Sequence, residues 1–305
     1  MKILVTGGAG FIGSHLVDAL IKRKHRVVVV DDLSVGLRRN VNPKARFIKL
    51  AVQDKKLKTV FSSNKFDFVF HLAAQKNLQV SKEEPMHDAE TNIMGGINVI
   101  ESVQKYKCKK IIFYSSAAIY DAFANPPNYE NDVPQPITPY GIAKLSIERY
   151  IEHSGICYTN LRPSNVYGSR QDAYGEGGVV AIFCSNLARA KQSKIFNTGR
   201  QTRDFIYVDD VVAATIACMR HGHNQTINIS TNRETSVNKL YATLVKIADT
   251  SQRPRRGIYL EEQQRSALNN SRAKRVLHWK PKKQLNQGLT KTYHWFHEQY
   301  EKKIT

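Results

Sequence analysis

The stretch KILVTGGAGFIGSHLVDALIKRKHRVVVVDD, Lys2–Asp32, decides the fold class. It opens with a short apolar run rich in β-formers, Lys2–Thr6. A glycine-rich segment then leads into Ser14–Lys22, where apolar residues recur at helical spacing. A second apolar run, Arg26–Val30, ends in two acids. Strand, glycine turn, helix and strand in this order form a βαβ unit, so the sequence predicts an α/β protein with a parallel sheet.

The glycines of this turn, and the acids after the second strand, indicate a dinucleotide site. Gly7, Gly10 and Gly13 let the backbone turn tightly and approach a pyrophosphate, while the helix start directs N–H groups at its negative charge. Asp31 and Asp32 stand where a carboxylate binds the adenine ribose and repels the extra phosphate of NADP. The pattern predicts NAD; a glycine turn of some other α/β protein is the alternative.

Further strand and helix patterns alternate along the chain. Phe47–Val52, Phe66–Leu72 and Lys110–Ser115 read as strands, with helical patterns such as Glu90–Gln104 between them. We therefore expect a doubly wound parallel Rossmann sheet that binds ligands at the carboxyl ends of its strands. The 305 residues suit two lobes. We predict an NAD-binding domain at residues 1–165 with about 205–232, and a smaller C-terminal α/β substrate lobe at 166–204 and 233–305.

A tyrosine and a lysine one helical turn apart mark the candidate catalytic group. Tyr140 and Lys144 follow a Pro-rich loop, and positions i and i+4 share one face of a helix. The lysine cation, with the positive charge of a nicotinamide, would lower the pKa of the tyrosine, whose phenolate then takes a proton from a substrate hydroxyl. Such pairs also arise by chance on surface helices, but here Ser116 ends an upstream strand and completes the set.

Four segments resemble those of the extended short-chain dehydrogenase/reductase family, the NAD-dependent epimerases and dehydratases. They are Thr6–Gly13 (TGGAGFIG), His71–Lys76 (HLAAQK), Tyr114–Tyr120 (YSSAAIY) and Arg162–Gly168 (RPSNVYG). The resemblance implies an NAD cofactor, with Ser116, Tyr140 and Lys144 as catalytic residues; His71 is expected to be structural. It also implies these cofactor contacts: Gly7, Gly10, Phe11, Ile12, Gly13, Asp31, Asp32, Val52, Leu72, Ala73, Ala74, Lys76, Asn92, Ser115, Tyr140, Lys144 and Pro163.

Two alanines after the serine indicate a branch of this family. Its sugar-nucleotide 4,6-dehydratases carry an Asp-Glu pair there, and its decarboxylases place an acid nearby. Ala117 and Ala118 can neither donate nor accept a proton. The resemblance therefore implies 4-epimerisation of a UDP-hexose through a transient 4-keto intermediate, with NAD recycled in each turnover. Another nucleotide-sugar epimerase, a 4-ketoreductase and a divergent non-catalytic NAD-binding paralogue are the alternatives.

The second half of the chain resembles the lobe that binds the nucleotide sugar. Gly175–Phe183 and Gln201–Asp210 match segments of that lobe. Arg203 would pair with the diphosphate, because a guanidinium fork suits phosphate oxygens. Ser266 is small where some epimerases carry a tyrosine, so we expect UDP-GlcNAc/UDP-GalNAc to be accepted as well as UDP-Glc/UDP-Gal. The implied substrate contacts are Ser116, Tyr140, Asn165, Val179, Phe196, Arg203 and Ser266.

The chain also departs from the family pattern, which bears on substrate identity and affinity rather than on the fold. At position 259 the family has an Arg that binds the diphosphate, and this chain has Tyr259. Arg255 or Arg256 would replace that Arg if the loop that carries them shifts register. The departures are Ala51 for an Asp near the adenine, Asp121 for a Gly after the catalytic serine, Tyr259 for the diphosphate-binding Arg and Asn269 for an Asp.

The composition of the chain indicates what kind of partner it binds and where in the cell it is found. Lys and Arg number 46 against 26 Asp and Glu, a net charge of +20. The basic residues are scattered in pairs without a nucleic-acid-binding motif, so we expect them to attract an anionic substrate rather than nucleic acid. No apolar run approaches the roughly 18–20 residues that span a bilayer, which favours a cytoplasmic protein. The family resemblance implies a homodimer through helices near Glu90–Gln104 and Tyr140–His153. We expect no metal site, and buried free thiols rather than disulfides, at Cys108, Cys157, Cys184 and Cys218.

Overall fold

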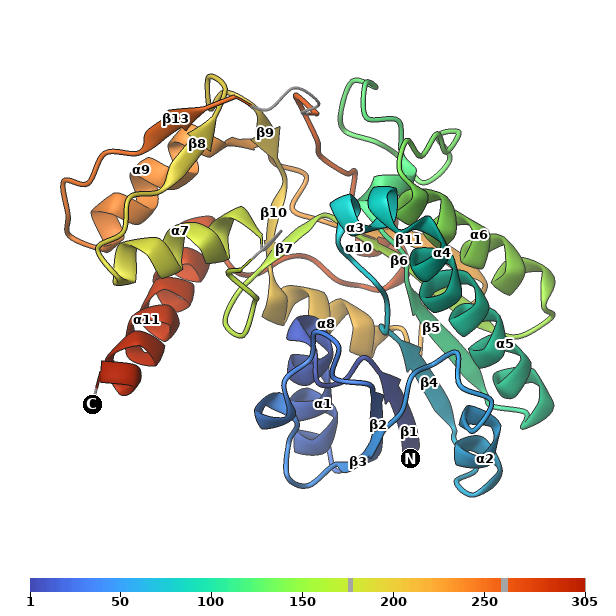
Figure 1. Cartoon of the computed structure of the whole chain (residues 1–305). Helices are drawn as coiled ribbons and strands as arrows, with labels where there is room; N and C mark the ends of the chain where they lie inside the picture. Colours follow the sequence, from blue (N-terminus) through green and yellow to red (C-terminus); the bar gives the residue numbers. More distant parts are fainter. Residues whose placement is uncertain (175–177, 259–262, 305) are drawn as a thin grey trace.

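The structure, a computed structural model, describes residues 1–174, 178–258 and 263–304 (Figure 1). Its strands are β1 (Lys2–Thr6), β2 (Arg26–Asp31), β3 (Arg46–Lys49), β4 (Phe68–His71), β5 (Lys110–Tyr114), β6 (Tyr158–Pro163), β7 (Asn165–Tyr167), β8 (Lys194–Phe196), β9 (Thr202–Arg203), β10 (Phe205–Tyr207), β11 (Gln225–Ile229), β12 (Thr235–Ser236) and β13 (Arg255–Gly257).

The helices connect and cover these strands. The α-helices are α1 (Phe11–Lys22), α2 (Leu57–Ser62), α3 (Leu78–Glu83), α4 (Pro85–Ala89), α5 (Gly95–Lys105), α6 (Pro139–His153), α7 (Val179–Ala188), α8 (Val208–Ala217), α9 (Val237–Ile247), α10 (Ser271–Val276) and α11 (Leu285–Ile304). Short 3-10 helices are η1 (Arg38–Asn40) and η3 (Ala117–Ile119), and η2 (Glu90–Met94) is a π-helix.

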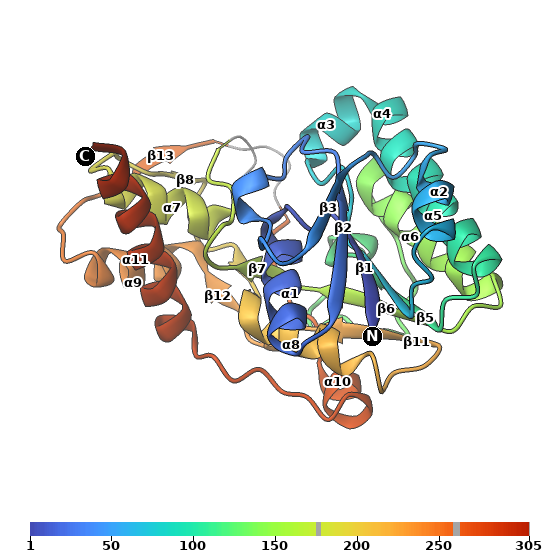
Figure 2. The ribbon, with the colours of Figure 1, turned by 90° about the horizontal axis from the view of Figure 1, so that it is seen from below.

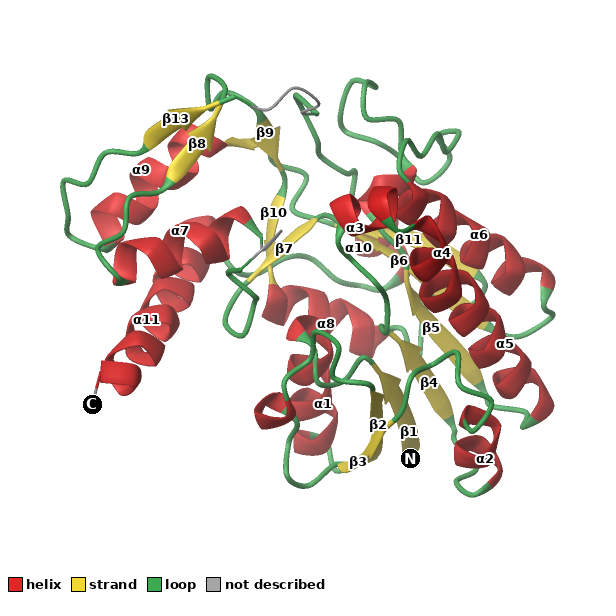
Figure 3. Cartoon of the chain, in the orientation of Figure 1, coloured by secondary structure: helices red, strands yellow, loops and turns green. Residues whose placement is uncertain are grey.

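Seven strands form the central sheet in the order β11-β6-β5-β4-β1-β2-β3 (Figure 3). Every neighbouring pair in this sheet is parallel. The chain runs outward from β1 to β3 and then returns to β4 on the other side of β1, so the strand order reverses between β1 and β4. The predicted doubly wound Rossmann sheet is confirmed, and this reversal is where such sheets bind their ligands.

Helices cover both faces of the sheet, which is why strands such as β1, β2 and β4 are nearly continuous apolar runs. Helices α1 and α8 lie on one face, and α2, α5 and α6 lie on the other (Figure 2). Side chains alternate between the two sides: Ile3 and Val5 of β1 pack into the core that includes α1, whereas Leu4 packs with α2 and α5. Each such fully buried side chain contributes roughly 1.5–3 kcal/mol.

The second lobe is smaller and is built from short strand pairs and three helices. Strands β8 and β13 pair in parallel and β9 pairs antiparallel with β12, while α11 packs against α7 and α9 (Figure 1). The rings of Phe183 in α7 and Tyr241 in α9 meet edge to face, with centroids 5.0 Å apart. Both rings belong to the buried cluster that also contains Leu16 of α1, so apolar packing continues from one lobe into the other.

The predicted helix Glu90–Gln104 is present, but its first turn is a π-helix. Residues Glu90–Met94 form this wider turn, and the regular α-helix begins at Gly95. Close packing follows immediately, because a Cβ on Gly95 would lie 2.7 Å from Val52 Cγ2 and one on Gly96 would lie 2.6 Å from Ile147 Cδ1. π-turns of this kind are frequent at functional sites.

The structure bears on two expectations from composition, the burial of the cysteines and the lack of a membrane-spanning segment. Cys108, Cys184 and Cys218 are buried free thiols, but Cys157 is partly exposed, with Sγ 3.3 Å from Nδ1 of His223. The expectation that all the cysteines are buried was therefore wrong for Cys157, which lies in the loop immediately before β6. Among the described residues, no helix combines the length and apolar character needed to span a membrane.

Candidate active site

A cavity of about 780 Å³ opens at the carboxyl ends of the central strands. Its walls combine the glycine turn, the ends of β2, β4 and β5, the start of α6 and the loop after β6. With one exception, Asn92, all the predicted cofactor residues line it. Asn92 lies behind the wall, 5 % exposed, where its amide nitrogen donates to the backbone oxygen of Gln75.

The glycine turn leaves room and open donors for an anion. Gly7 has a φ of +71°, and a Cβ there would lie 2.6 Å from the backbone nitrogen of Ala73. A Cβ on Gly13 would lie only 2.1 Å from the carbonyl oxygen of Gly7. Helix α1 begins after Gly10 with no side-chain cap, so its first N–H groups are available to a pyrophosphate.

Buried polar atoms along the cavity wall also fit a bound ligand. The hydroxyls of Ser115 and Ser164, Nη1 of Arg170 and Oε1 of Gln171 are buried and have no hydrogen-bond partner within the structure. Buried polar groups in native proteins nearly always have one. These atoms and the glycine turn fit a polar dinucleotide such as NAD; Ser164, Arg170 and Gln171 were not among the predicted contacts.

Asp31 has a structural task besides the predicted contact with ribose. One carboxylate oxygen accepts the N–H of Ala9 and the other that of Leu33, both at 2.9 Å. The side chain therefore holds the glycine turn against the end of β2. Asp32 accepts both the N–H and the hydroxyl of Ser34. Both acids line the cavity.

Gly13 provides a direct test of the dinucleotide site. We expect Gly13→Ala to weaken NAD binding at least tenfold, about 1.4 kcal/mol, because the added Cβ must push α1 away from Gly7. Isothermal titration with NAD, or the NAD content after purification, measures this. Gly155→Ala is the control for an added methyl group away from the site, because no atom lies within 4 Å of its added Cβ; its positive φ affects only the local turn. Unchanged NAD binding in Gly13→Ala would contradict the assignment.

Ser116, Tyr140 and Lys144 meet on one wall of the cavity. Ser116 follows β5 and caps η3, its hydroxyl accepting the N–H of Ala118 at 3.1 Å. Helix α6 begins against the same short helix, because Thr138 caps it and a Cβ on Gly141 would lie 2.4 Å from the Ala118 oxygen. The first turn of α6 therefore brings Tyr140 to Ser116.

Lys144 is held rigidly beneath the tyrosine. Its side chain is 3 % exposed, and its ammonium donates to the backbone oxygen of Tyr114 at 2.8 Å. The nitrogen lies 5.7 Å from the centroid of the Tyr140 ring and 4.9 Å from that of Phe113. The predicted i, i+4 arrangement is therefore present, and the lysine faces the ring of the tyrosine.

Burial dominates the electrostatics of this pair in the protein alone. It raises the pKa of Tyr140 to about 12, and a hydrogen bond with Ser116 only partly opposes this. Burial also lowers the pKa of Lys144 to about 8. We expected the lysine to lower the pKa of the tyrosine; in the protein alone the bond from Ser116 is what lowers it, and desolvation of the phenolate outweighs that bond. Formation of the phenolate therefore depends on further positive charge.

His71 has the expected structural position. It is 2 % exposed, with Nδ1 2.8 Å from the hydroxyl of Thr6, and its ring lies against Phe113. Burial lowers the pKa of His71 to about 3, so the ring is neutral at physiological pH. It packs beneath the loop that continues to Ala73, whose N–H also bonds Thr6.

The substrate contacts predicted in the second lobe do not line this cavity. Asn165 is exposed on β7, Phe196 is 37 % exposed on β8, and Arg203 donates to the backbone oxygen of Thr202 on β9. Val179 begins α7, and Ser266 is 9 % exposed beside β9. The predictions for Tyr259 and for Gly175–Gly177 lie outside the described residues. The placement of the sugar nucleotide in this lobe therefore stays a prediction.

The departures from the family pattern lie in loops and caps. Asp121 accepts the N–H of Phe123, and Asn269 accepts that of Ser271 at the start of α10. Ala51 follows β3 and accepts the N–H of Asp54. Each residue has a local structural role.

Part of the cavity wall comes from a helix that sequence reasoning did not connect with the site. The C-terminal helix α11 presents two pairs at i, i+4 spacing, and α7 adds Ser185 together with its C-cap residue Arg189. The spacing predicts one helix face, but only the packing of α11 against α7 turns that face toward the NAD-binding domain. The α11 residues in the wall are Trp295, Phe296, Gln299 and Tyr300.

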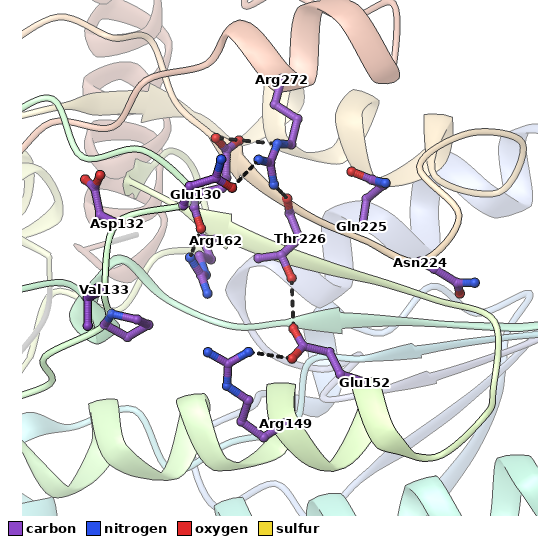
Figure 4. Close-up of a pocket in the computed structure, with 12 residues that line it drawn as sticks. Glu130, Asp132, Val133, Arg149, Glu152, Arg162, Asn224, Gln225, Thr226 and Arg272 are labelled. Carbon is purple, nitrogen blue, oxygen red and sulfur yellow. Dashed lines mark hydrogen bonds and ion pairs between the residues drawn. The ribbon is translucent and has the colours of Figure 1, made fainter.

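A second hollow, of about 450 Å³, lies beside β11, α6 and α10 (Figure 4). Its charged side chains pair with neighbours: Arg149 bonds Glu152 at 2.6 Å, and Arg272 bonds Asn131 at 2.7 Å and lies 3.8 Å from Glu130. The described residues that line it include none of the predicted site residues. The charged side chains of this hollow already bond one another, and no predicted site residue that the structure describes lines it. The cavity of about 780 Å³ is therefore the candidate active site.

Comparisons with known proteins agree with this geometry. Residues 3–230 match the model of the NAD dependent epimerase/dehydratase family. The chain is 40% identical to a putative UDP-glucose 4-epimerase of Methanocaldococcus jannaschii, over 96% of this chain and 97% of that protein. The structure matches UDP-glucose 4-epimerase of Thermotoga maritima, solved with UDP-glucose, at a TM-score of 0.96 and 44% identity, covering 98% of this chain and 100% of that one.

A further solved structure bears on the cofactor. UDP-glucose 4-epimerase of Thermus thermophilus, in complex with NAD, matches at a TM-score of 0.91 and 31% identity, covering 97% of this chain and 99% of that chain. The predicted family and the predicted cofactor, NAD, are thereby confirmed. The chain belongs to the NAD-dependent epimerase/dehydratase family.

Proposed function

We propose that this protein catalyses the 4-epimerisation of a UDP-hexose. The observation that carries the proposal is the convergence of Ser116, Tyr140 and Lys144 on the wall of the cavity that contains the dinucleotide turn. When bound, NAD would supply reversible hydride transfer at the sugar carbon. The protein's own groups must therefore move the hydroxyl proton and hold the sugar.

The three side chains divide this work. Tyr140 takes the proton of the substrate hydroxyl, and Ser116, which bonds the phenol, polarises or relays that proton. Lys144 supplies positive charge beneath the ring and a donor for the ribose. Because burial alone raises the pKa of Tyr140 to about 12, the phenolate needs both Lys144 and the positive nicotinamide.

The residues after Ser116 favour epimerisation over elimination or decarboxylation. Ala117 and Ala118 begin η3 and carry no acid or base. No acid or base at these two positions can therefore drive loss of water or of CO₂ from a keto intermediate. Reduction from the other face regenerates the hydroxyl with inverted configuration. UDP-Glc/UDP-Gal are the proposed substrates, and 2-N-acetylated UDP-hexoses are included because Ser266 is small.

The test is turnover of defined nucleotide sugars without added cofactor. Purified protein is incubated with UDP-Gal, UDP-GalNAc or UDP-GalA, and the products are identified by NMR. We expect the C4 epimer to form without external NAD, since an epimerase regenerates its cofactor in each cycle. Turnover that consumes added NADH stoichiometrically would favour a 4-ketoreductase. No conversion of any UDP-hexose, even with NAD supplied, would contradict the proposal.

We also infer a homodimer, with the helices near Glu90–Gln104 and Tyr140–His153 at its interface. Large apolar side chains are exposed on these helices: Met94 is 58 % exposed, Ile142 51 % and Tyr150 52 %. Burying them between subunits would remove apolar surface from water. Light scattering should give twice the chain mass, and Ile142→Glu should shift it to the monomer mass. A monomeric wild type would contradict the inference.

A further inference from the structure

Asp88 is a buried acid on a short helix that packs against α6, the helix of Tyr140 and Lys144. It lies in α4 and is 1 % exposed. Its Oδ1 accepts two amide N–H groups, from Gln75 at 3.0 Å and from Asn92 at 2.9 Å. Both recorded partners are neutral. A buried carboxylate retained without a cation at hydrogen-bond distance is costly, so its charge calls for an explanation.

The two amides connect Asp88 to the cavity wall. Gln75 belongs to the loop after β4, and its sequence neighbours Ala74 and Lys76 line the cavity. The same loop is bonded a second time, because Asn92 also donates to the backbone oxygen of Gln75 at 2.9 Å. Asp88 therefore holds the loop and the π-turn of Asn92 together.

The charge of Asp88 also reaches the catalytic pair. It raises the pKa of Lys144 against the effect of burial, and it raises the pKa of Tyr140. The other acid that acts on Lys144 is Glu148, on the same helix. Glu148 is already bonded through both oxygens to Arg162, at 2.9 and 2.5 Å.

Asp88 is therefore the acid near Lys144 that has no bonded cation among the described residues. Burial raises the pKa of Asp88 itself, while its two amide bonds and the charges of Lys144 and His87 act in the opposite direction. His71, on the strand below, interacts with Lys144 but is neutral at physiological pH. Ser116, the side chain bonded to Tyr140, carries no charge.

We propose that Asp88 is a positioning residue for the epimerase reaction: it ties the loop over the cofactor through Gln75 and Asn92, and its negative charge balances the ammonium of Lys144. This inference rests on the proposed function for its kinetic consequence. The electrostatic part concerns the protein alone and can be measured without substrate.

Asp88→Asn removes the charge and conserves the shape. Both recorded bonds go to Oδ1, so an amide nitrogen in place of the other oxygen leaves them intact. Loss of a nearby negative charge lowers the pKa of both Lys144 and Tyr140. We expect both limbs of the pH profile of kcat to move to lower pH, by about one unit. A purely structural role would lower kcat without moving either limb.

A second readout does not depend on turnover. In protein labelled with [13C]lysine, the signal of Lys144 is assigned by its absence in Lys144→Met, and its chemical shift is followed with pH. The pKa of Lys144, about 8 in the wild type, should fall in Asp88→Asn. Glu90→Gln is the matched control, because this acid is exposed two residues further along and should leave the titration unchanged.

The outcomes separate the two proposals. An unchanged Lys144 titration in Asp88→Asn overturns the role of Asp88, whatever the substrate is. A shifted titration in a protein that converts no UDP-hexose supports the electrostatic role and contradicts the proposed function alone. If Asp88→Asn does not fold, Asp88→Ser, smaller and also neutral, is used for the same titration.

Discussion

Tyr140→Phe is expected to lower kcat for UDP-hexose epimerisation by about three orders of magnitude, within the roughly 10²–10⁴-fold range of general acid–base catalysis. The phenol is the group on the cavity wall that is bonded to Ser116 and lies above Lys144. Phenylalanine keeps the ring and its packing and removes only the proton acceptor. NAD should still be retained, because the glycine turn and Asp31 are untouched and only the hydroxyl of one predicted cofactor contact is removed. Single-turnover NMR with UDP-Gal measures the loss.

The control is a second tyrosine on the same helix. Tyr150 is 52 % exposed near the other end of α6, so Tyr150→Phe makes the same chemical change away from the cavity. Its kcat should stay within about twofold of the wild type, a difference of at most about 0.5 kcal/mol, because phenylalanine keeps the ring that we infer to be buried between subunits. Equal activity in Tyr140→Phe and wild type would show that another group moves the proton.

Glu148→Gln is expected to lower the free energy of unfolding by about 3–5 kcal/mol. Arg162 and Glu148 form a two-bond pair in which the side chains are 3 % and 0 % exposed. The remaining guanidinium nitrogen donates to the hydroxyl of Tyr120 at 2.9 Å, which in turn bonds Asn228 of β11. Removing the carboxylate charge leaves a buried cation without its counter-ion. Urea unfolding followed by circular dichroism measures the difference.

Glu101→Gln makes the same change in an exposed pair. Glu101 on α5 bonds Lys58 at 2.9 Å, but the two side chains are 57 % and 44 % exposed. Solvent screens this pair, so its loss should cost no more than about 1 kcal/mol. Equal destabilisation by the two substitutions would contradict the distinction between the buried and exposed pairs.

The N-terminal motif and the sheet were predictable because their signals are local. The strand, turn and helix of Lys2–Lys22 follow from residues adjacent in the chain, as does the i, i+4 relation of Tyr140 and Lys144. The fold, the family and the cofactor NAD were confirmed. Helix boundaries were less accurate: α1 begins at Phe11 rather than Ser14, since an uncapped helix start leaves no distinct signal.

The second lobe was harder to predict because its contacts are distant in sequence. The aromatic residues of α11 reach the cavity only because this helix packs against α7, more than a hundred residues earlier. The role of Asp88 was also missed. An isolated acid in a short helix gives no sequence signal, and its partners Gln75 and Asn92 come from separate elements.

The sequence by itself determined the βαβ start, the dinucleotide turn and the residue types available for proton transfer, because backbone geometry and helical spacing act over a few residues. Only the tertiary structure decided which of these groups meet and what charge they carry. Burial of Tyr140 and Lys144 shifts the pKa of each away from its ordinary value, and the acid that acts on both residues, Asp88, comes from another helix. Desolvation and charge proximity depend on how distant segments pack, and the order of residues in one segment does not contain that information.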